Sequence, residues 1–218
     1  LPRSYQRPRQ FKLPLDGLRR APGLPHKQKR GAPARAIGIS HENLCKLSKR
    51  LILMRHAQSD DFEHSCDFER PLSVRGQQDA AHMRHWFHAQ GYHPQNALVS
   101  AAKRTAETYD LLQIENCHAF LSKALYLAPA TTLLTALKKT TGPSVLMIGH
   151  NFGISDLANR LRKDRSANPE FKIFPPGAIW VADLPIEDWR ALNWGAASSV
   201  NFKSPQGVRT KLSNGPRR

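Results

Sequence analysis

The stretch Leu51-Ile52-Leu53-Met54-Arg55-His56 is the basis of the fold prediction for this chain. Its first four residues form a short continuous apolar run, which is typical of a strand buried on both faces of a sheet. Two similar runs follow at intervals of about fifty residues, at residues 97–99 and 145–148. Polar residues follow each run, so the chain predicts several buried strands whose ends carry functional side chains.

Segments with helical periodicity lie between these runs. Residues 73–89 place Ala80, Met83 and Phe87 on one side, and Gly91 follows at the point where a left-handed residue commonly ends a helix. Further elements are expected as helices at residues 103–112, 129–139 and 153–161 and as a strand at residues 178–184. This alternation predicts an α/β three-layer sandwich, a mostly parallel sheet with helices on both faces.

Positive charge is concentrated at the two ends of the chain. The formal net charge is +16, of which residues 1–49 contribute +10 and residues 201–218 contribute +5, whereas residues 50–200 are nearly neutral at +1. We therefore expect a folded domain over residues 50–200 between a disordered basic leader and a disordered basic tail. Such tails bind nucleic acid only non-specifically, through charge.

The leader, residues 1–49, allows three interpretations. An Arg-rich, acid-poor segment is typical of an organellar transit peptide. It is also compatible with a polyanion-binding arm, or with a stretch foreign to the native protein, since the chain begins with Leu1. No apolar run is long enough to span a membrane, and three widely spaced cysteines favour a reducing compartment. The prediction is a cytoplasmic protein, or an organellar one if the leader is a transit peptide.

Four side chains at the ends of the predicted strands suit a bound phosphoryl group. Arg55 and His56 follow the first strand, Arg104 comes shortly after the second, and His150 follows the third. The carboxyl ends of parallel strands meet at one edge of a sheet, where ligands bind. Arginine donates paired hydrogen bonds to phosphoryl oxygens, and a neutral imidazole can attack phosphorus. Without an acidic cluster this set favours an anion over a metal, and no metal or cofactor is predicted.

Four segments, in order, resemble the motifs of the histidine phosphatase superfamily. They are residues 51–59, 70–76, 100–108 and 148–153. The Arg-His-Ala, Arg-Pro-Leu and Gly-His-Asn sequences within them are most similar to the SixA-type phosphohistidine phosphatase branch. The resemblance implies a phosphoglycerate mutase-like fold and a metal-independent hydrolase without a cofactor.

The resemblance also implies a role for each matching residue. His56 would be the nucleophile that forms a phosphohistidine intermediate, Arg55 and Arg104 would hold the phosphoryl oxygens, and His150 would donate a further hydrogen bond to them. Ser59 and Asn151 are candidates for substrate binding, with helix caps or turns as the alternative. His82, His85 and His88 recur every three residues on one predicted helix, but they lie outside the predicted site.

The chain departs from the superfamily in ways that bear on the substrate. Many members carry a glutamate that protonates the leaving oxygen, but residues 121–132 contain no Asp or Glu. An imidazole leaving group has a conjugate acid with a pKa of ~6.5 and can leave protonated at neutral pH. The missing acid therefore favours a phosphorus–nitrogen bond, unless Asp60 or Asp61 supplies the proton. Phe152 replaces a frequent proline, and Gln58 replaces a frequent lysine.

Three functions follow, in order of preference. The first is removal of phosphate from phosphohistidine in a protein substrate. The second is hydrolysis of a small phosphorylated molecule, and a mutase activity is weaker still because it requires water exclusion and a carboxylate. The third, from another class, is a non-enzymatic scaffold whose tails bind polyanions.

Overall fold

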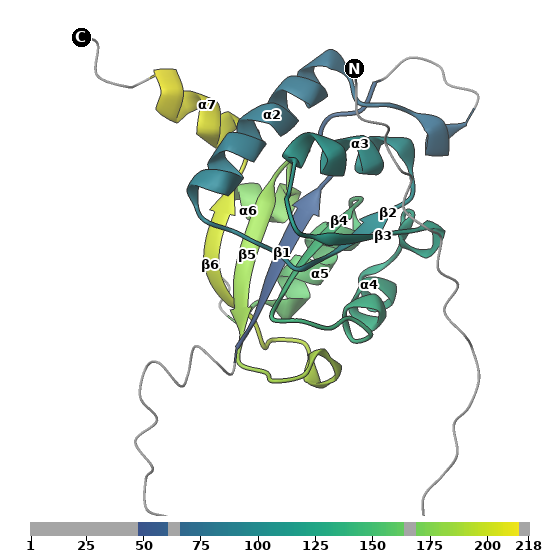
Figure 1. The fold of residues 1–218 in the computed structure, drawn as a ribbon, viewed down its shortest axis with the longest axis vertical. Helices are drawn as coiled ribbons and strands as arrows, with labels where there is room; N and C mark the ends of the chain where they lie inside the picture. The colour runs from purple at the N-terminus through teal and green to yellow at the C-terminus, as the bar shows by residue number, and fades with distance from the viewer. Residues whose placement is uncertain (1–47, 61–65, 164–168, 214–218) are drawn as a thin grey trace, which may run out of the picture.

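The computed structural model describes residues 48–60, 66–163 and 169–213, with side chains described as far as residue 209 (Figure 1). Nearly all of the predicted basic leader, residues 1–49, lies outside the described residues. None of the described helices combines the length and the apolar character needed to cross a membrane.

The described strands form one sheet of six strands in the order β3-β2-β4-β1-β5-β6. Their bounds are β1 Lys49–Arg55, β2 Asn96–Ser100, β3 His118–Ser122, β4 Ser144–Gly149, β5 Ile179–Leu184 and β6 Ser198–Lys203. β3, β2, β4 and β1 pair in parallel, whereas β5 pairs antiparallel with both β1 and β6. The predicted mostly parallel sheet is confirmed.

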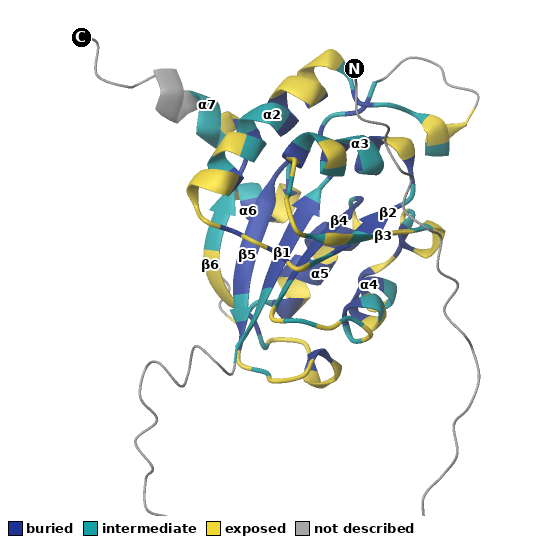
Figure 2. Ribbon diagram, viewed as in Figure 1, coloured by how far each residue is buried: buried dark blue, intermediate teal, exposed yellow. Residues whose placement is uncertain are grey.

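Helices cover both faces of this sheet. Their bounds are α2 Val74–Ala89, α3 Lys103–Leu112, α4 Ala130–Leu137, α5 Gly153–Leu161, α6 Pro169–Ile173 and α7 Pro205–Ser213, with short 3-10 helices at η1 Asp67–Glu69, η2 Lys123–Leu125 and η3 Trp189–Ala191. On β1, Leu51 and Leu53 belong to a core cluster with residues of α4, α5 and α6, whereas Ile52 and Met54 belong to a cluster with residues of α2 and α3. The central strands are therefore buried from both sides, as Figure 2 shows, and the three-layer sandwich is confirmed.

The prediction of a disordered tail over residues 201–218 is wrong for residues 201–213. Phe202 of β6 packs against Phe171 and Phe174, with ring centroids 5.3 and 5.5 Å apart, and Val208 of α7 packs against the core beside α2. Among the described side chains, each element contributes one apolar anchor within a basic segment. A single apolar residue does not produce the periodicity that predicts a strand or a helix. Residues 214–218 lie outside the described residues.

Four elements, β3, α6, β6 and α7, have no counterpart among the predicted strands and α-helices. The strand β3 lies at one edge of the sheet, and its burial pattern shows no fully buried residue. Its apolar run, residues 119–121, is as short as the run at residues 97–99, but Phe120 and Leu121 are exposed at the edge of the sheet. It is therefore defined by its pairing with β2 and not by its own side chains.

Candidate active site

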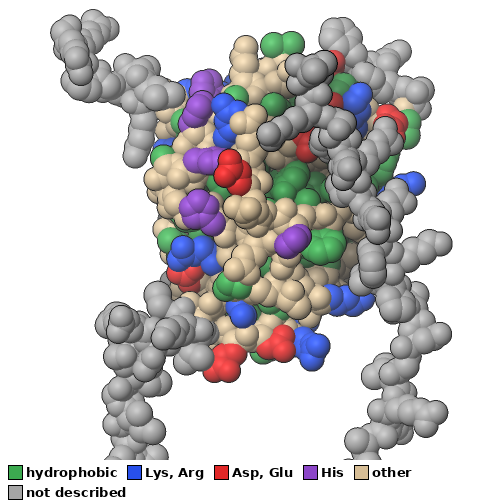
Figure 3. Space-filling model, in the orientation of Figure 1, with side chains coloured by type: hydrophobic (Ala, Val, Ile, Leu, Met, Phe, Trp, Pro, Cys, Tyr) green, Lys and Arg blue, Asp and Glu red, His purple; other side chains and the backbone are tan. Residues whose placement is uncertain are grey.

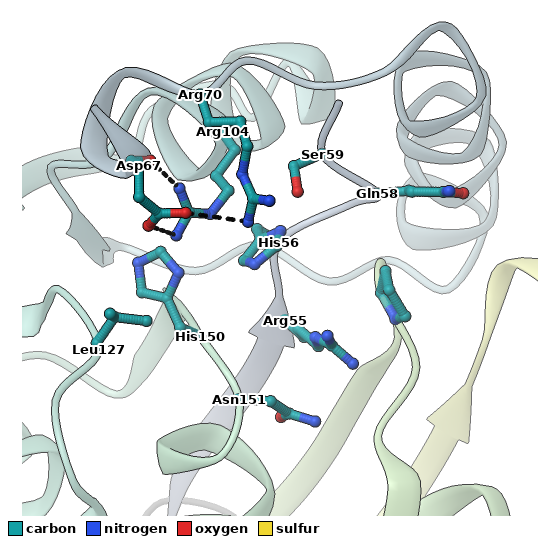
Figure 4. Close-up of a pocket in the computed structure, with 11 residues that line it drawn as sticks. Arg55, His56, Gln58, Ser59, Asp67, Arg70, Arg104, Leu127, His150 and Asn151 are labelled. Carbon is teal, nitrogen blue, oxygen red and sulfur yellow. Dashed lines mark hydrogen bonds and ion pairs between the residues drawn. The ribbon is translucent and has the colours of Figure 1, made fainter. Parts of the chain in front are cut away.

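A pocket of about 440 Å³ lies at the carboxyl ends of β1 and β4 (Figure 4). It is intermediate between an enclosed cavity and an open surface. All six residues predicted for the site line this pocket, namely Arg55, His56, Ser59, Arg104, His150 and Asn151. The fold thus brings together residues that lie up to 96 positions apart in the sequence.

The end of β1 is held from two sides. Arg55 pairs with Gly149 in the parallel ladder of β1 and β4, and the N–H of His56 donates to the Gly149 carbonyl at 3.0 Å. From the other side, the N–H of Gly177 donates to the carbonyls of Arg55 and His56, at 3.2 and 3.0 Å. Backbone hydrogen bonds of this kind fix the direction in which the two side chains leave the strand.

His56 has the tautomer and charge that a nucleophile needs. Its Nδ1 lies 2.7 Å from the Ala57 carbonyl oxygen, which can only accept, so Nδ1 carries the hydrogen and Nε2 keeps a free lone pair. The side chain is only 7% exposed. Burial is the main cause that lowers the pKa of His56 to about 3, and the nearby arginines Arg104 and Arg55 add to it. The ring is therefore neutral at neutral pH.

His150 lies beside His56, with ring centroids 5.1 Å apart. Its Nε2 is 2.8 Å from the hydroxyl of Ser100 at the end of β2, and its Nδ1 has no hydrogen-bond partner among the described residues. Burial lowers the pKa of His150 to about 4. When Ser100 donates to Nε2, Nδ1 carries the ring hydrogen.

The two predicted arginines reach the pocket from different elements. Arg55 leaves the end of β1 and donates from Nη1 to the Phe174 carbonyl at 3.0 Å. Arg104 lies in the first turn of α3 and is 2% exposed. The hydroxyl of Thr108, one turn later in α3, accepts from the Ala57 N–H at 3.1 Å and so ties this helix to the segment after His56. The Nε atoms of both arginines are buried and have no partner among the described residues.

Two further charged residues, Asp67 and Arg70, line the pocket and were absent from the predicted set. Arg104 donates to Asp67 twice, from Nη1 to the backbone carbonyl at 2.6 Å and from Nη2 to Oδ2 at 2.9 Å. Arg70 lies 3.2 Å from Oδ1 of the same carboxylate. Arg70 belongs to the Arg-Pro-Leu motif, which is a sequence signal. Asp67 has none, because its contact with Arg104 spans 37 positions.

The remaining candidates have structural partners. Asn151 donates from Nδ2 to the carbonyls of Ile173 and Phe174, at 2.8 and 3.3 Å, and thereby anchors the same carbonyl that Arg55 contacts. Ser59 is buried and forms an isolated bridge with Leu72. Asp60 does not line the pocket, and Asp61 lies outside the described residues.

The histidines of α2 do not line the pocket. Figure 3 shows histidine side chains spaced over the surface of the molecule, separated by other residues. Within the described ranges, no three His, Cys, Asp or Glu side chains are grouped so that they could hold a metal ion. The pocket itself presents a neutral imidazole and three arginines, a set suited to an oxyanion and a nucleophilic attack on it.

Comparisons with known proteins place this fold. No model of a protein family matches the chain. A chloroplastic protein of Arabidopsis thaliana, named as uncharacterized, is 30% identical over 148 residues, in an alignment that covers 60% of this chain and 67% of the relative.

Three solved structures carry the name SixA. The phosphohistidine phosphatase SixA of Nakamurella multipartitia superposes with a TM-score of 0.66 at 22% identity and covers 72% of this chain and 96% of its own. The SixA of Agrobacterium tumefaciens superposes at 0.60 with 22% identity, over 72% and 98% of the chains. A protein histidine phosphatase SixA in complex with tungstate superposes at 0.57 with 20% identity, over 73% and 99%. The superpositions establish a common fold.

Proposed function

The chain belongs to the family of the chloroplastic Arabidopsis protein and has the fold of the SixA-type histidine phosphatases, and on this premise we propose that it is a metal-independent phosphatase that forms a phosphohistidine intermediate on His56. Its substrate in this proposal is phosphohistidine in another protein. Arg55 and Arg104 hold the phosphoryl oxygens, and His150 donates a further hydrogen bond to them. Ser59 and Asn151 shape the pocket around the substrate.

The observation that carries the proposal is the state of His56. A histidine attacks phosphorus only when its ring is neutral and one nitrogen is free. The bond from Nδ1 to the Ala57 carbonyl leaves Nε2 free, and the pKa of about 3 keeps the ring neutral. Arg55 and Arg104, which line the same pocket, supply the positive charge that a phosphoryl group needs as it is transferred.

The acid chemistry of the pocket supports a nitrogen leaving group. Residues 121–132 contain no acid, and among the residues that line the pocket only Asp67 carries a carboxyl group. A hydrogen bond from Tyr126, followed by contacts with Arg104, holds the pKa of Asp67 below its ordinary value. A carboxyl group that is ionised at neutral pH has no proton to give to an alkoxide. Imidazole leaves without such a donor, and SixA relatives are named for phosphohistidine.

A small phosphorylated molecule is the second candidate substrate. The observation in its favour is the pocket volume of about 440 Å³, which falls within the range of small-molecule sites. We rank it second because a sugar or alkyl phosphate needs a proton on its leaving oxygen.

Trapping the intermediate tests the nucleophile. The protein is mixed with a phosphorylated substrate, quenched without acid, and mapped by mass spectrometry. We expect phosphate on His56, and neither phosphate nor turnover in His56→Ala. His85→Ala, which removes an exposed histidine of α2, is the matched control and keeps full activity. Phosphate on another residue, or turnover by His56→Ala, would contradict the proposal.

A substrate panel tests the preference for phosphohistidine. Initial rates are compared for a phosphohistidine peptide, an alkyl phosphate and a sugar phosphate at equal concentration. We expect the peptide to have the highest kcat/KM. A clear preference for the esters would replace the protein substrate by a small molecule and leave the nucleophile assignment intact.

We further propose that residues 1–49 direct the protein to an organelle. The segment is rich in arginine and poor in acids, and the Arabidopsis relative is named as chloroplastic. A fusion of residues 1–49 to a fluorescent protein, imaged against a variant with its arginines replaced by glutamine, tests the idea. Cytosolic fluorescence of both fusions would return the prediction to a cytoplasmic protein with a polyanion-binding arm.

A further inference from the structure

Asp67 poses an electrostatic problem in a pocket built for an anion. It is the one acidic residue among the described residues that line the pocket, and its side chain is 47% exposed. A carboxylate beside a phosphoryl group repels it, which weakens binding unless the carboxylate has another task. The structure therefore raises the question of what Asp67 contacts in the bound state.

The carboxylate of Asp67 is held firmly in its position. Its Oδ2 accepts a hydrogen bond from the Tyr126 hydroxyl. The same oxygen also accepts from Arg104 Nη2, and Oδ1 pairs with Arg70 (Figure 4). The neighbouring ring of Phe68 packs edge-on against Tyr126, with centroids 5.1 Å apart. A side chain fixed by several partners is preorganised, as groups that recognise a substrate must be.

These contacts leave the carboxylate ionised and with one hydrogen-bond acceptor site unused. Two carboxylate oxygens offer about four acceptor sites, and the contacts with Tyr126, Arg104 and Arg70 use three of them. The remaining site belongs to Oδ1, the oxygen with one contact. The Tyr126 hydrogen bond and the positive charge of Arg104 also keep the pKa of Asp67 low, so the group remains an acceptor at neutral pH.

The part of the substrate that can meet this acceptor is the leaving group. The phosphoryl oxygens are negative and belong with the arginines. An imidazole phosphorylated on one nitrogen carries a hydrogen, and with it a positive charge, on the other nitrogen when protonated. Because Asp67 bonds directly to Arg104, its carboxylate lies one guanidinium group away from the site proposed for the phosphoryl oxygens.

We infer that Asp67 accepts a hydrogen bond from the distal N–H of the phosphorylated imidazole in the substrate and so selects nitrogen-linked phosphate over phosphate esters, an inference that rests on the proposed function. The contact stabilises the protonated ring, which is the form that leaves most readily. An ester offers no N–H to Asp67, and its leaving oxygen gains negative charge close to the carboxylate.

The transfer step then needs no external acid. The lone pair of His56 Nε2 forms a bond to phosphorus while the phosphorus–nitrogen bond of the substrate breaks. The electron pair of that bond returns to the substrate nitrogen, and the ring leaves as neutral imidazole. Its hydrogen remains on the distal nitrogen, which donates to Asp67. The positive charge passes to the ring of His56, whose Nδ1–H stays bonded to the Ala57 carbonyl. Water then attacks phosphorus, Nε2 recovers its pair, and inorganic phosphate and one proton are released.

The substitution Asp67→Asn tests this inference. It removes the charge and keeps the shape, and its amide oxygen can still accept from Arg104 and Tyr126. The measured quantity is the ratio of kcat/KM for a phosphohistidine peptide to kcat/KM for p-nitrophenyl phosphate, whose leaving group needs no proton. We expect this ratio to fall at least about tenfold, the effect of one charge-assisted hydrogen bond. A ratio cancels any loss of folded protein, because unfolding lowers both activities equally.

Two further variants complete the experiment. Asp67→Glu keeps the charge and should retain most of the ratio, and it serves if the asparagine variant does not fold. Asp183→Asn makes the same chemical change in a carboxylate that pairs with Arg50 at 2.7 Å and does not line the pocket, so the ratio should stay unchanged.

The outcomes separate the inference from the proposed function. An equal loss on both substrates in Asp67→Asn would overturn the inference, since it would show that Asp67 only orients Arg104. An unchanged ratio would overturn it as well. Hydrolysis of p-nitrophenyl phosphate but not of the phosphohistidine peptide by the unaltered protein would overturn the proposed function, and the inference with it.

Discussion

The two halves of the sheet contribute to the pocket in different ways. The parallel half, β3-β2-β4-β1, provides His56, Arg55 and His150 directly at the ends of β1 and β4, and Arg104 through α3 after β2. The antiparallel half, β5 and β6 together with α6 and α7, provides mainly backbone groups. These include the Gly177 N–H, which holds the end of β1, and the Phe174 carbonyl, which accepts from Arg55 and Asn151.

This difference shows that the reactive side chains of a site can be recognised in a sequence, whereas the backbone groups that position them cannot. The side chains of the parallel half must be of specific types, because only they donate to or attack a phosphoryl group. The antiparallel half contributes N–H and C=O groups that every residue possesses, so its role depends on position alone. Changes in the first half should therefore affect chemistry most, and changes in the second should affect stability and alignment.

Among variants that keep the nucleophile, the largest effect is expected from Arg104→Ala in the parallel half. Loss of a charge-assisted hydrogen bond of about 1.5–3 kcal/mol slows turnover at least about tenfold. Steady-state kinetics below the melting temperature checks this, with Arg190→Ala, an exposed arginine after β5, as the control. Equal turnover in the two variants would mean that Arg104 does not hold the phosphoryl group.

A smaller effect is expected from Gly177→Ala in the antiparallel half. Gly177 has a φ of +74°, and a Cβ there would lie 2.9 Å from Pro205 Cγ at the start of α7. We expect a lower Tm and a several-fold loss of turnover, because the N–H that holds Arg55 and His56 shifts. Gly195→Ala is the matched control, with a φ of +72° and nothing within 4 Å of its Cβ.

Both glycine substitutions incur similar backbone strain, of about 1–2 kcal/mol. For a protein of this size that corresponds to a drop in Tm of about 2–4 °C per kcal/mol. The comparison depends on turnover, which should fall in Gly177→Ala only. If both variants kept full turnover, the antiparallel half would not align the nucleophile.

A still smaller effect is expected from Arg209→Ala in α7. Arg209 pairs with the buried Asp79 of α2, which retains only a 3.9 Å contact with Arg75 once Arg209 is removed. Because Arg209 is partly exposed, we expect a loss of about 1 kcal/mol in the free energy of unfolding and no change in turnover. Chemical denaturation measures the first and kinetics the second. A large loss of turnover would show that α7 has a more direct role.

The smallest effect is expected on the charge of the two histidines of the parallel half as the pH falls from 7 to 5. The pKa values of His56 and His150 are lowered to about 3 and about 4, so both rings stay neutral between pH 7 and pH 5. NMR titration of their ring hydrogens should show little change in this range, whereas a free histidine with a pKa of ~6.5 becomes mostly protonated. Titration of either ring near pH 6.5 would contradict the burial seen in the structure.

The same shifts set the sign of the stability change. Below pH 6.5 the unfolded chain binds protons on these two histidines and the folded chain does not, until the pH approaches 4. The free energy of unfolding should therefore fall as the pH decreases from about 6.5 towards 4. Thermal melting over this range, compared with His150→Ala, measures the contribution of that histidine.

The strands and helices of the parallel half were predictable because each has its own pattern. The predicted strand at residues 145–148 lies within β4, and the predicted helices at residues 103–112 and 153–161 match α3 and α5. The grouping of His56, Arg104 and His150 in one pocket followed from the rule that ligands bind at the carboxyl ends of parallel strands. The edge strand β3 and the helix α7 were not predicted. Pairing with β2 defines the strand, and Val208 is the one apolar anchor among the described side chains of the helix.

The amino-acid sequence by itself determined the fold class and the chemical character of the site. Continuous apolar runs require burial on both faces, and paired arginines and histidines after those runs suit an anion. Only the tertiary structure decided which atoms are free to react. It bonds Nδ1 of His56 to the Ala57 carbonyl and buries the ring away from water. It also pairs Asp67 with Arg104, which is 37 positions away in the sequence. Both depend on distances in space between groups that are remote in the chain or common to every residue, and local sequence patterns do not encode such distances.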